Sequence, residues 1–477
     1  MHYNSKLYLI ALLTLLLWSK TVYAQTKVLV ISDPHVMASE LIVNEGEAWT
    51  SYVNADRKLI DYSKTLFDLM VDRLKTEILP DLVLITGDLT KDGEAVSHQY
   101  VKGKLDELKA AGIPTLVITG NHDWGTDNAN YYDGSKTTAA ATLSMSEIAT
   151  LYGDYGFGST EREMTTLTYA CEPIAGLVVI GIDSGCNGQL SSTTLDWVCD
   201  KAKAACHDGK KVLAMMHHPL IPHFTDAENF IESMSIDNYA TVRNALADAG
   251  VRIIFTGHFH TSDIAMDYNA DLSKTIYDVN TGSLISYPND YRTIMMPADF
   301  SSVTITTSSM TEISPSDGFA STAKSRLHTA VENMIKAKGA AYAVIAGTAA
   351  DAFIFHTEGD EADNADAQET LSTLISVGKL AKTFGTITGD QFTAFSTMAN
   401  SMLKDLTNYG VAGRENQTAD RTLAISLDAV TNDGEDTALR DRLLFPPQTS
   451  AIYTLQGIKV DHPSSGIYIS NGRVIIK

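Results

Sequence analysis

The tetrapeptide Gly120-Asn121-His122-Asp123 carries side chains suited to binding a metal ion. It follows an apolar run at residues 115–119, and continuous apolar runs of this kind are typical of buried parallel strands. We therefore expect Asn121 and His122 in the loop beyond the carboxyl end of a strand, where open α/β sheets bind ligands. An amide oxygen beside an imidazole suits a hard-to-borderline divalent metal ion.

The same pattern, an apolar run followed by Asp, Asn or His, recurs between residues 28 and 260. Because the carboxyl ends of parallel strands meet at one edge of a sheet, these polar side chains are expected to converge. Histidines scattered through a core would not lie so consistently at strand ends. The residues selected in this way are Asp33, His35, Asp88, Asn121, His122, His217, His258 and His260.

Carboxylate, imidazole and amide ligands from five loops predict two adjoining divalent metal sites. Asp88 stands alone after its strand and is the natural bridge between the two ions. His122 lies beside a candidate ligand, and in its protonated form it could donate a proton or stabilise a developing oxyanion. Asn121 and His122 are also expected to bind substrate, together with His223. Asp123 is expected to brace the loop.

Five ordered blocks, Asp-x-His, Gly-Asp, Gly-Asn-His-Asp, His-x-Pro and Gly-His-x-His, resemble the calcineurin-like metallophosphoesterases over about residues 27–306. Within that family, residues 87–93 and 217–219 are most similar to the 3′,5′-cyclic-nucleotide phosphodiesterases. The resemblance implies a four-layer α/β/β/α sandwich that hydrolyses phosphodiesters, with cyclic nucleotides among the candidates, by attack of a metal-bridging hydroxide. A phosphomonoesterase of the same fold is the main alternative, and a non-catalytic binding scaffold is a remote one.

The resemblance also implies how the ligands are divided between two metal ions, which are expected to be Mn, Fe or Zn. His122 would lie outside both coordination shells, close to the leaving oxygen. His217 is preferred to His218 because relatives carry a different residue at the second position. Lys91 occupies the position where purple acid phosphatases of the same superfamily have an iron-binding Tyr, so a purple site is not expected. One ion would be bound by Asp33, His35, Asp88 and His260, and the other by Asp88, Asn121, His217 and His258.

The sequence predicts a catalytic unit at residues 25–310, a mostly helical accessory unit at 311–447 and a C-terminal β segment at 448–477. The helical unit is rich in Ala, Thr and Met and supplies no candidate ligand. Residues 358–369 are acidic and are predicted to form a solvated loop. His98 is predicted to lie on an exposed, polar helix face.

Residues 1–24 have the pattern of a secretory signal peptide, with Lys6 before an apolar run and Val22-Tyr23-Ala24 at its end. A short membrane anchor is the alternative, although the run is short for a membrane span. Export predicts a periplasmic, cell-surface or secreted protein and permits disulfides. Cys199 and Cys206, two helical turns or about 10 Å apart, are too distant to pair with each other, and the other pairings stay open.

The formal net charge of −22 argues against polymeric nucleic acid as a partner, since the sequence lacks the Lys/Arg excess that tracks phosphate backbones. The expected partner is instead a small phosphoester substrate. The C-terminal strands resemble sorting modules of the type IX secretion pathway, through residues 455–457 and 466–468 and a basic, apolar end at Lys477. That resemblance implies contact with secretion machinery. The sequence leaves the oligomeric state open.

Overall fold

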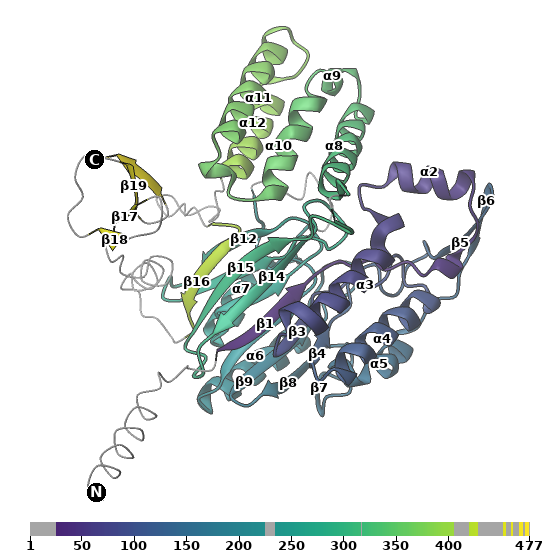
Figure 1. Cartoon of the computed structure of the whole chain (residues 1–477), viewed down its shortest axis with the longest axis vertical. Helices are drawn as coiled ribbons and strands as arrows, with labels where there is room; N and C mark the ends of the chain where they lie inside the picture. The colour runs from purple at the N-terminus through teal and green to yellow at the C-terminus, as the bar shows by residue number, and fades with distance from the viewer. Residues whose placement is uncertain are drawn as a thin grey trace, which may run out of the picture.

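The computed structural model describes residues 25–224, 234–315, 317–404 and 419–427, together with short strands between residues 452 and 476. Two large mixed sheets form its centre (Figure 1). The apolar runs become inner strands because they are covered on both faces, as every residue of β3 is buried. The first sheet has the order β16 (Thr422–Ser426), β15 (Ser302–Ser309), β14 (Asp290–Met296), β1 (Thr26–Ile31), β3 (Leu82–Ile85) and β4 (Thr115–Val117).

The second sheet is built around parallel strands β9, β10, β11 and β13, which supply further strand ends to the same region of the molecule. Antiparallel pairing adds β12 at one edge and β8 and β7 at the other. Its order is β12 (Asp263–Tyr268), β13 (Thr275–Asn280), β11 (Ile253–Thr256), β10 (Lys211–Met216), β9 (Leu177–Ile182), β8 (Tyr169–Ile174) and β7 (Glu161–Arg162).

The packing of β10 shows why the sheets form two inner layers. Leu213 and Met215 lie in the large apolar cluster shared with the first sheet, whereas Val212 and Ala214 pack with the outer helices of the second. This confirms the predicted four-layer α/β/β/α sandwich. The outer layers are α3 (Ser63–Arg73) and α4 (Ala95–Ala110) on the first sheet, and α6 (Ser192–His207) and α7 (Tyr239–Asp248) on the second.

Shorter elements lie in the connections between these strands and helices. Among them, α2 follows the first predicted metal ligands along the chain and lines a pocket described below. They are η1 (Ser39–Leu41), β2 (Ile42–Asn44), α2 (Glu47–Ala55), η2 (Ile60–Tyr62), η3 (Leu74–Ile78), β5 (Asn130–Asp133), β6 (Lys136–Ala139), α5 (Met145–Leu151) and η4 (Gly153–Tyr155).

The helical unit packs beside one end of the sheets, at the top of Figure 1. Leu327 and Val331 of α8 meet Phe353 of α10 in one apolar cluster, and Leu371 of α11 and Leu403 of α12 lie in a second. Its elements are α8 (Phe319–Ala337), α9 (Ala340–Ala343), α10 (Ala346–Glu358), η6 (Glu361–Asp363), α11 (Ala365–Thr383) and α12 (Gly389–Leu403).

Two sequence-based expectations need correction here. The first sheet does not end near residue 310, because β16 returns from the predicted helical unit to pair with β15. The acidic segment 358–369 is helical rather than a solvated loop, and Glu361 is buried, where its Oε1 accepts a hydrogen bond from His356 Nδ1 at 2.5 Å. The remaining boundaries of the catalytic and helical units stay a prediction.

The C-terminal segment contains an antiparallel sheet in the order β18 (Lys459–Val460), β17 (Ile452–Thr454), β19 (Ile467–Ser470) and β20 (Arg473–Ile476). The predicted signal peptide at residues 1–24 lies outside the described residues. Within the described part of the chain, no helix combines the length and the apolar character needed to cross a membrane. The four cysteines are free thiols in the structure.

Candidate metal centre

Five of the predicted ligands have a backbone conformation that L-residues rarely adopt. The φ angles are 49° at Asp33, 39° at His35, 50° at Asp88, 66° at His258 and 64° at His260. Each such residue costs on the order of 1–3 kcal/mol and persists only where the surrounding structure enforces it. Their gathering at strand ends is therefore a structural sign of a functional site, independent of the residue types.

The first group of candidate ligands contains Asp33, His35, Asp88 and His260, all of them buried. One donor atom from each lies within 4.8 Å of the others. His260 Nε2 is 3.2 Å from Asp33 Oδ1, and His35 Nε2 is 3.5 Å from Asp88 Oδ2. The Nε2 atoms of His35 and His260 face each other at 3.1 Å. Facing nitrogens of this kind could both be satisfied by one cation between them.

The second group contains Asp88, His217 and His258. His217 Nε2 lies 3.3 Å from Asp88 Oδ2. The side-chain oxygen of Asn121 is 3.0 Å from His217 Nε2 and 2.9 Å from His258 Nδ1. Asp88 is the one residue common to both groups among the described residues, which is the position that a bridging carboxylate requires.

The protonation states of these histidines suit a metal ion, because only a neutral imidazole nitrogen can act as a ligand. Burial, and then the charge of Lys58, hold the pKa of His35 well below its usual value. Burial, and then the neighbouring His218 and His217, do the same to the pKa of His258. At His217, burial is outweighed by the Asp88 carboxylate, which raises the pKa to about 9, so a bound cation would displace a proton there.

The ring nitrogens that face the other donors are Nε2 at His35 and His260 and Nδ1 at His258. At His217, Nδ1 donates to the carbonyl oxygen of Thr86 at 2.8 Å, so Nε2, from which a bound cation would displace the proton, faces Asp88 and Asn121. Together with the carboxylates and the amide, this donor set fits divalent metal ions.

At two glycines, the backbone lies so close to a candidate ligand that no side chain would fit. A Cβ atom on Gly120 would lie 2.2 Å from Asp88 Oδ1, and one on Gly257 would lie 2.5 Å from Asp33 Oδ2. Any side chain at either position would therefore push a candidate ligand out of place. The loop after β4 is also fixed by Asp123, whose carboxylate accepts from the backbone N–H groups of Gly120 at 2.9 Å and Thr90 at 2.9 Å, as expected.

His122 lies at the edge of the centre with its side chain 28% exposed. Its backbone N–H donates to Asp88 Oδ1 at 2.8 Å, and its ring meets that of His35 edge-on at 4.9 Å between centroids. Its Nδ1 lies 2.8 Å from Asp92 Oδ1, and Asp92 is in turn paired with buried Lys91. Asp92 was not among the site residues predicted from the sequence. The signal that could have found it was its place in the motif block at residues 87–93.

The structure does not bring every candidate to the centre. His223 is buried with Nδ1 2.9 Å from Asp263 Oδ1 and Nε2 3.5 Å from Asp278 Oδ2, so the geometry gives no support to its predicted substrate contact. His218 is also buried, beside His258, and its Nδ1 contacts Ser184 Oγ at 2.8 Å.

The prediction for His98 was wrong, because this residue is fully buried. Its Nε2 lies 2.8 Å from the carbonyl oxygen of Asp123 and its Nδ1 2.9 Å from the hydroxyl of Tyr152. His98 therefore supports the loop that carries Asn121 and His122.

Comparison with known proteins identifies the sequence segment that carries the centre. The family described as Calcineurin-like phosphoesterase matches residues 26–262. A cAMP/cGMP dual specificity phosphodiesterase of Mycobacterium tuberculosis is 24% identical over 45% of this chain and 60% of its own length. A protein of Arcobacter nitrofigilis, named as a probable glycerophosphodiester phosphodiesterase, is 29% identical over 42% of this chain and 64% of its own length.

The chain thus spans less than two thirds of the length of these two relatives. Among solved structures, a dimetal phosphatase from Danio rerio superposes with a TM-score of 0.43 at 14% identity, over 60% of this chain and 96% of that one.

Proposed function

We propose that this chain, which matches the family described as Calcineurin-like phosphoesterase over residues 26–262, hydrolyses phosphodiesters in a metal-dependent reaction. The observation that carries the proposal is the position of Asp88, which belongs to both groups of candidate metal ligands. A shared carboxylate is the ligand that a two-metal phosphoesterase needs.

We propose that one ion binds Asp33, His35, Asp88 and His260 and that the second binds Asp88, Asn121, His217 and His258. Bound divalent ions would lower the pKa of coordinated water and neutralise the charge of a phosphoryl group. The donor set admits Mn, Fe or Zn.

The residues of the chain that act directly on substrate are proposed to be His122 and Asn121. With Nδ1 held by Asp92, His122 has only Nε2 left to deliver a proton to the departing alkoxide. The Asp92 carboxylate fixes the orientation of the ring, and Lys91 holds Asp92 in place from the buried side. Asn121 has its oxygen turned towards His217 and His258, which leaves its amide group as a donor at the edge of the centre.

The names of the relatives favour a diester, since one is called a cAMP/cGMP phosphodiesterase and another a glycerophosphodiester phosphodiesterase. Cyclic nucleotides are therefore the first biological substrates to test. A phosphomonoesterase of the same fold is the second candidate, because the shared metal-binding geometry serves either ester.

The test combines metal analysis with a substrate panel of bis-p-nitrophenyl phosphate, p-nitrophenyl phosphate and cyclic nucleotides. We expect two metal ions per chain and faster hydrolysis of the diesters than of the monoester. Faster hydrolysis of the monoester would replace the proposal by a phosphatase. A fully metal-loaded protein that hydrolyses none of the three would refute catalysis and favour a binding scaffold.

Export is a separate proposal that rests on the signal-like residues 1–24 and on the resemblance of the C-terminal strands to sorting modules. We expect the protein in the periplasm, at the cell surface or in the medium. Fractionation of cells expressing the full chain and a chain truncated after residue 447 tests both parts. Retention of the full chain in the cytoplasm would contradict export, and unchanged delivery of the truncated chain would contradict the sorting role.

A further inference from the structure

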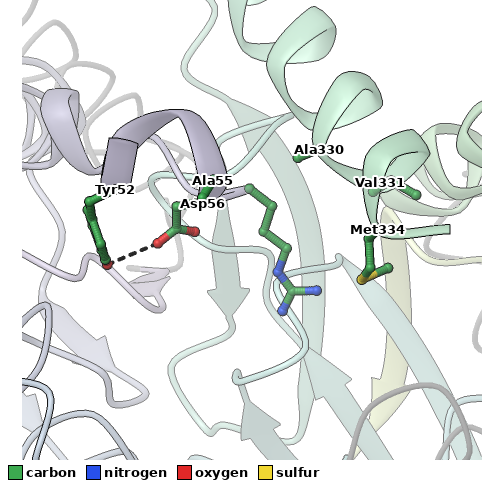
Figure 2. A pocket seen from close by; sticks show the side chains of 7 residues that line it. Tyr52, Ala55, Asp56, Ala330, Val331 and Met334 are labelled. Carbon is green, nitrogen blue, oxygen red and sulfur yellow. Dashed lines mark hydrogen bonds between the residues drawn. The ribbon is translucent and has the colours of Figure 1, made fainter. Parts of the chain in front are cut away.

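A pocket of about 350 Å³ lies between α2 of the catalytic unit and α8 of the helical unit. This is within the range of about 300–1,000 Å³ that small-molecule sites occupy. Tyr52 and Ala55 line it from α2, and Ala330, Val331 and Met334 line it from α8 (Figure 2). One wall is therefore supplied by a unit whose role could not be predicted from its sequence.

The α8 wall is held against the catalytic unit at its amino-terminal end. Arg326 Nη1 donates to both carboxylate oxygens of Asp61, at 2.9 and 3.0 Å, and its guanidinium lies over the ring of Tyr62. The same Tyr62 ring contacts Phe319, which is buried in the main core. Since these contacts lie only one to three helical turns from Ala330, the pocket is a fixed feature of the interface.

Arg57 is the one cationic side chain among the described residues that line the pocket. It is half-buried, and its guanidinium makes no hydrogen bond or ion pair of its own with any residue that the structure describes. The adjacent Asp56 is occupied elsewhere, because it accepts from the hydroxyl of Tyr52 at 3.0 Å (Figure 2). It also accepts from the backbone N–H of Lys58 at 2.9 Å. A half-buried, unpaired guanidinium in a pocket is suited to an anionic ligand.

The segment that carries Arg57 is anchored to the metal centre through backbone contacts. Leu59, two residues later, donates its backbone N–H to the carbonyl oxygen of Ile285 at 2.7 Å, and neighbouring Ser283 donates to the carbonyl oxygen of Asp33 at 2.8 Å. The pKa of Arg57 is lowered by burial and raised by Asp56 and then by Asp33, so the charges of Arg57 and Asp33 act on each other.

A second, independent chain of contacts joins the pocket to the proposed proton donor. Lys91 Nζ lies 4.7 Å from the centre of the Tyr52 ring, Lys91 is paired with Asp92, and Asp92 contacts His122 Nδ1 at 2.8 Å. Chains of direct contacts thus link residues of the pocket wall and its flank to Asp33 of the metal centre and to the Asp92–His122 pair.

We propose that this pocket is the subsite for the organic ester group of the substrate. Tyr52, Ala330 and Met334 would contact an apolar or aromatic substituent, and Arg57 would bind the phosphoryl oxygens. The preferred substrates are then phosphate esters with a bulky, ring-containing substituent. The inference rests on the proposed function, since it assigns an ester group to a phosphoester hydrolase.

Binding to the metal-loaded full chain tests the pocket without requiring turnover. Phenylphosphonate and methylphosphonate, which differ only in the organic group, are titrated by calorimetry into the wild type and Ala330→Trp. We expect the variant to weaken phenylphosphonate binding by about 10-fold or more, because the indole would fill the space that the phenyl ring needs, and methylphosphonate binding by less than about 3-fold. Ser325→Trp, at an exposed position on another face of α8, is the matched control and should change neither affinity.

Met334→Ala provides a second test at a partly exposed position where folding is not at risk, with Met164→Ala as its matched control. It should weaken phenylphosphonate selectively, whereas the control should not. Equal effects of Ala330→Trp on both phosphonates, or no effect of either α8 variant on phenylphosphonate, would overturn the subsite assignment.

Kinetics separate failure of this inference from failure of the proposed function. Bis-p-nitrophenyl phosphate and methyl p-nitrophenyl phosphate share a leaving group and differ in the ester group that remains. We expect Ala330→Trp to lower kcat/KM about 10-fold or more for the first and less than about 3-fold for the second. Arg57→Gln should weaken both phosphonates and raise KM for both esters with the metal content unchanged.

Hydrolysis of both esters with equal sensitivity to Ala330→Trp would refute the subsite alone. Loss of both bound metals in Arg57→Gln would refute the anion-binding role of Arg57. Wild-type protein that binds phenylphosphonate selectively but hydrolyses neither ester would refute the proposed function and keep the pocket as a ligand site.

Discussion

Substitution of Asp92 by Asn tests whether the Asp92–His122 pair acts in proton delivery. The change preserves side-chain shape but removes the negative charge that lies 2.8 Å from His122 Nδ1. Loss of a general acid typically costs about 10²–10⁴-fold in rate, and this is the loss we expect for His122→Ala. Asp92→Asn keeps the imidazole but holds its ring less firmly in one orientation, so we expect a smaller loss of about 10–10³-fold.

The same change has a stability cost, because Lys91 is buried and pairs with Asp92. Breaking a buried pair costs about 3–5 kcal/mol when the remaining charge has no other partner. Here Glu94 Oε1 stays 3.6 Å from Lys91 Nζ and the Tyr52 ring lies 4.7 Å from it, so we expect about 1–3 kcal/mol. Urea unfolding measures this loss, and kinetics are compared at temperatures where both proteins are fully folded.

The diagnostic assay is the dependence of the rate on the leaving group. A nitrophenolate can leave without being protonated, whereas an alkoxide needs a proton to leave. Asp92→Asn should therefore slow the hydrolysis of alkyl phosphodiesters far more than that of bis-p-nitrophenyl phosphate. In a His122→Ala background, Asp92→Asn should cause almost no further loss, and both variants should keep their metal ions. An equal loss on both kinds of ester, or full additivity of the two substitutions, would refute the positioning role of Asp92.

Three further predictions concern the centre, the buried histidine and the domain boundary. Asp88→Ala should abolish both metal binding and turnover, because both groups of candidate ligands lose a member. Two ions bound at full stoichiometry in this variant would contradict the bridging role of Asp88. Burial lowers the pKa of His98 to about 4, from about 6.5 in an unfolded chain. Between these pH values the unfolded state binds more protons than the folded state, so the free energy of unfolding should fall as the pH drops from about 6.5 to 4. The loss should be roughly 3 kcal/mol in urea titrations and absent in His98→Gln, and parallel pH profiles would rule out this origin. Truncation after residue 447 should spare activity. Truncation after residue 310 should yield insoluble protein, because it removes β16 from the edge of β15 and uncovers Phe259, which lies in the chain between the candidate ligands His258 and His260. An active, soluble 25–310 protein would contradict this.

The sequence was sufficient to predict the strand ends and the residues that converge there. The runs at β1, β3, β4, β10 and β11 are short, apolar and continuous, and each is followed within four residues by side chains of a metal-binding type. A parallel strand has a fixed direction, so its carboxyl end can be placed from local pattern alone. The order of the strands in the sheets is therefore not needed to predict that Asp33, Asp88, Asn121 and His258 converge.

Residues whose surroundings come from distant parts of the chain were harder to predict. His98 shares a helix face with Val101 and Leu105, and this spacing could have indicated burial, but its partners lie near residues 123 and 152. Asp92 was visible as a motif residue, yet only the folded loop places it against His122 Nδ1.

The tertiary structure alone decided the return of β16 and the position of α8. β16 pairs with β15 across more than a hundred intervening residues, and an antiparallel edge strand has no local signal that names its partner. Met334 and Ala330 look like ordinary positions on an amphipathic helix, because periodicity shows which face is apolar but not what that face meets. The docking of Arg326 on Asp61 and of Phe319 on Tyr62 turns this face towards Arg57. Such contacts depend on the shape and charge of two surfaces from distant parts of the chain, which no local pattern shows.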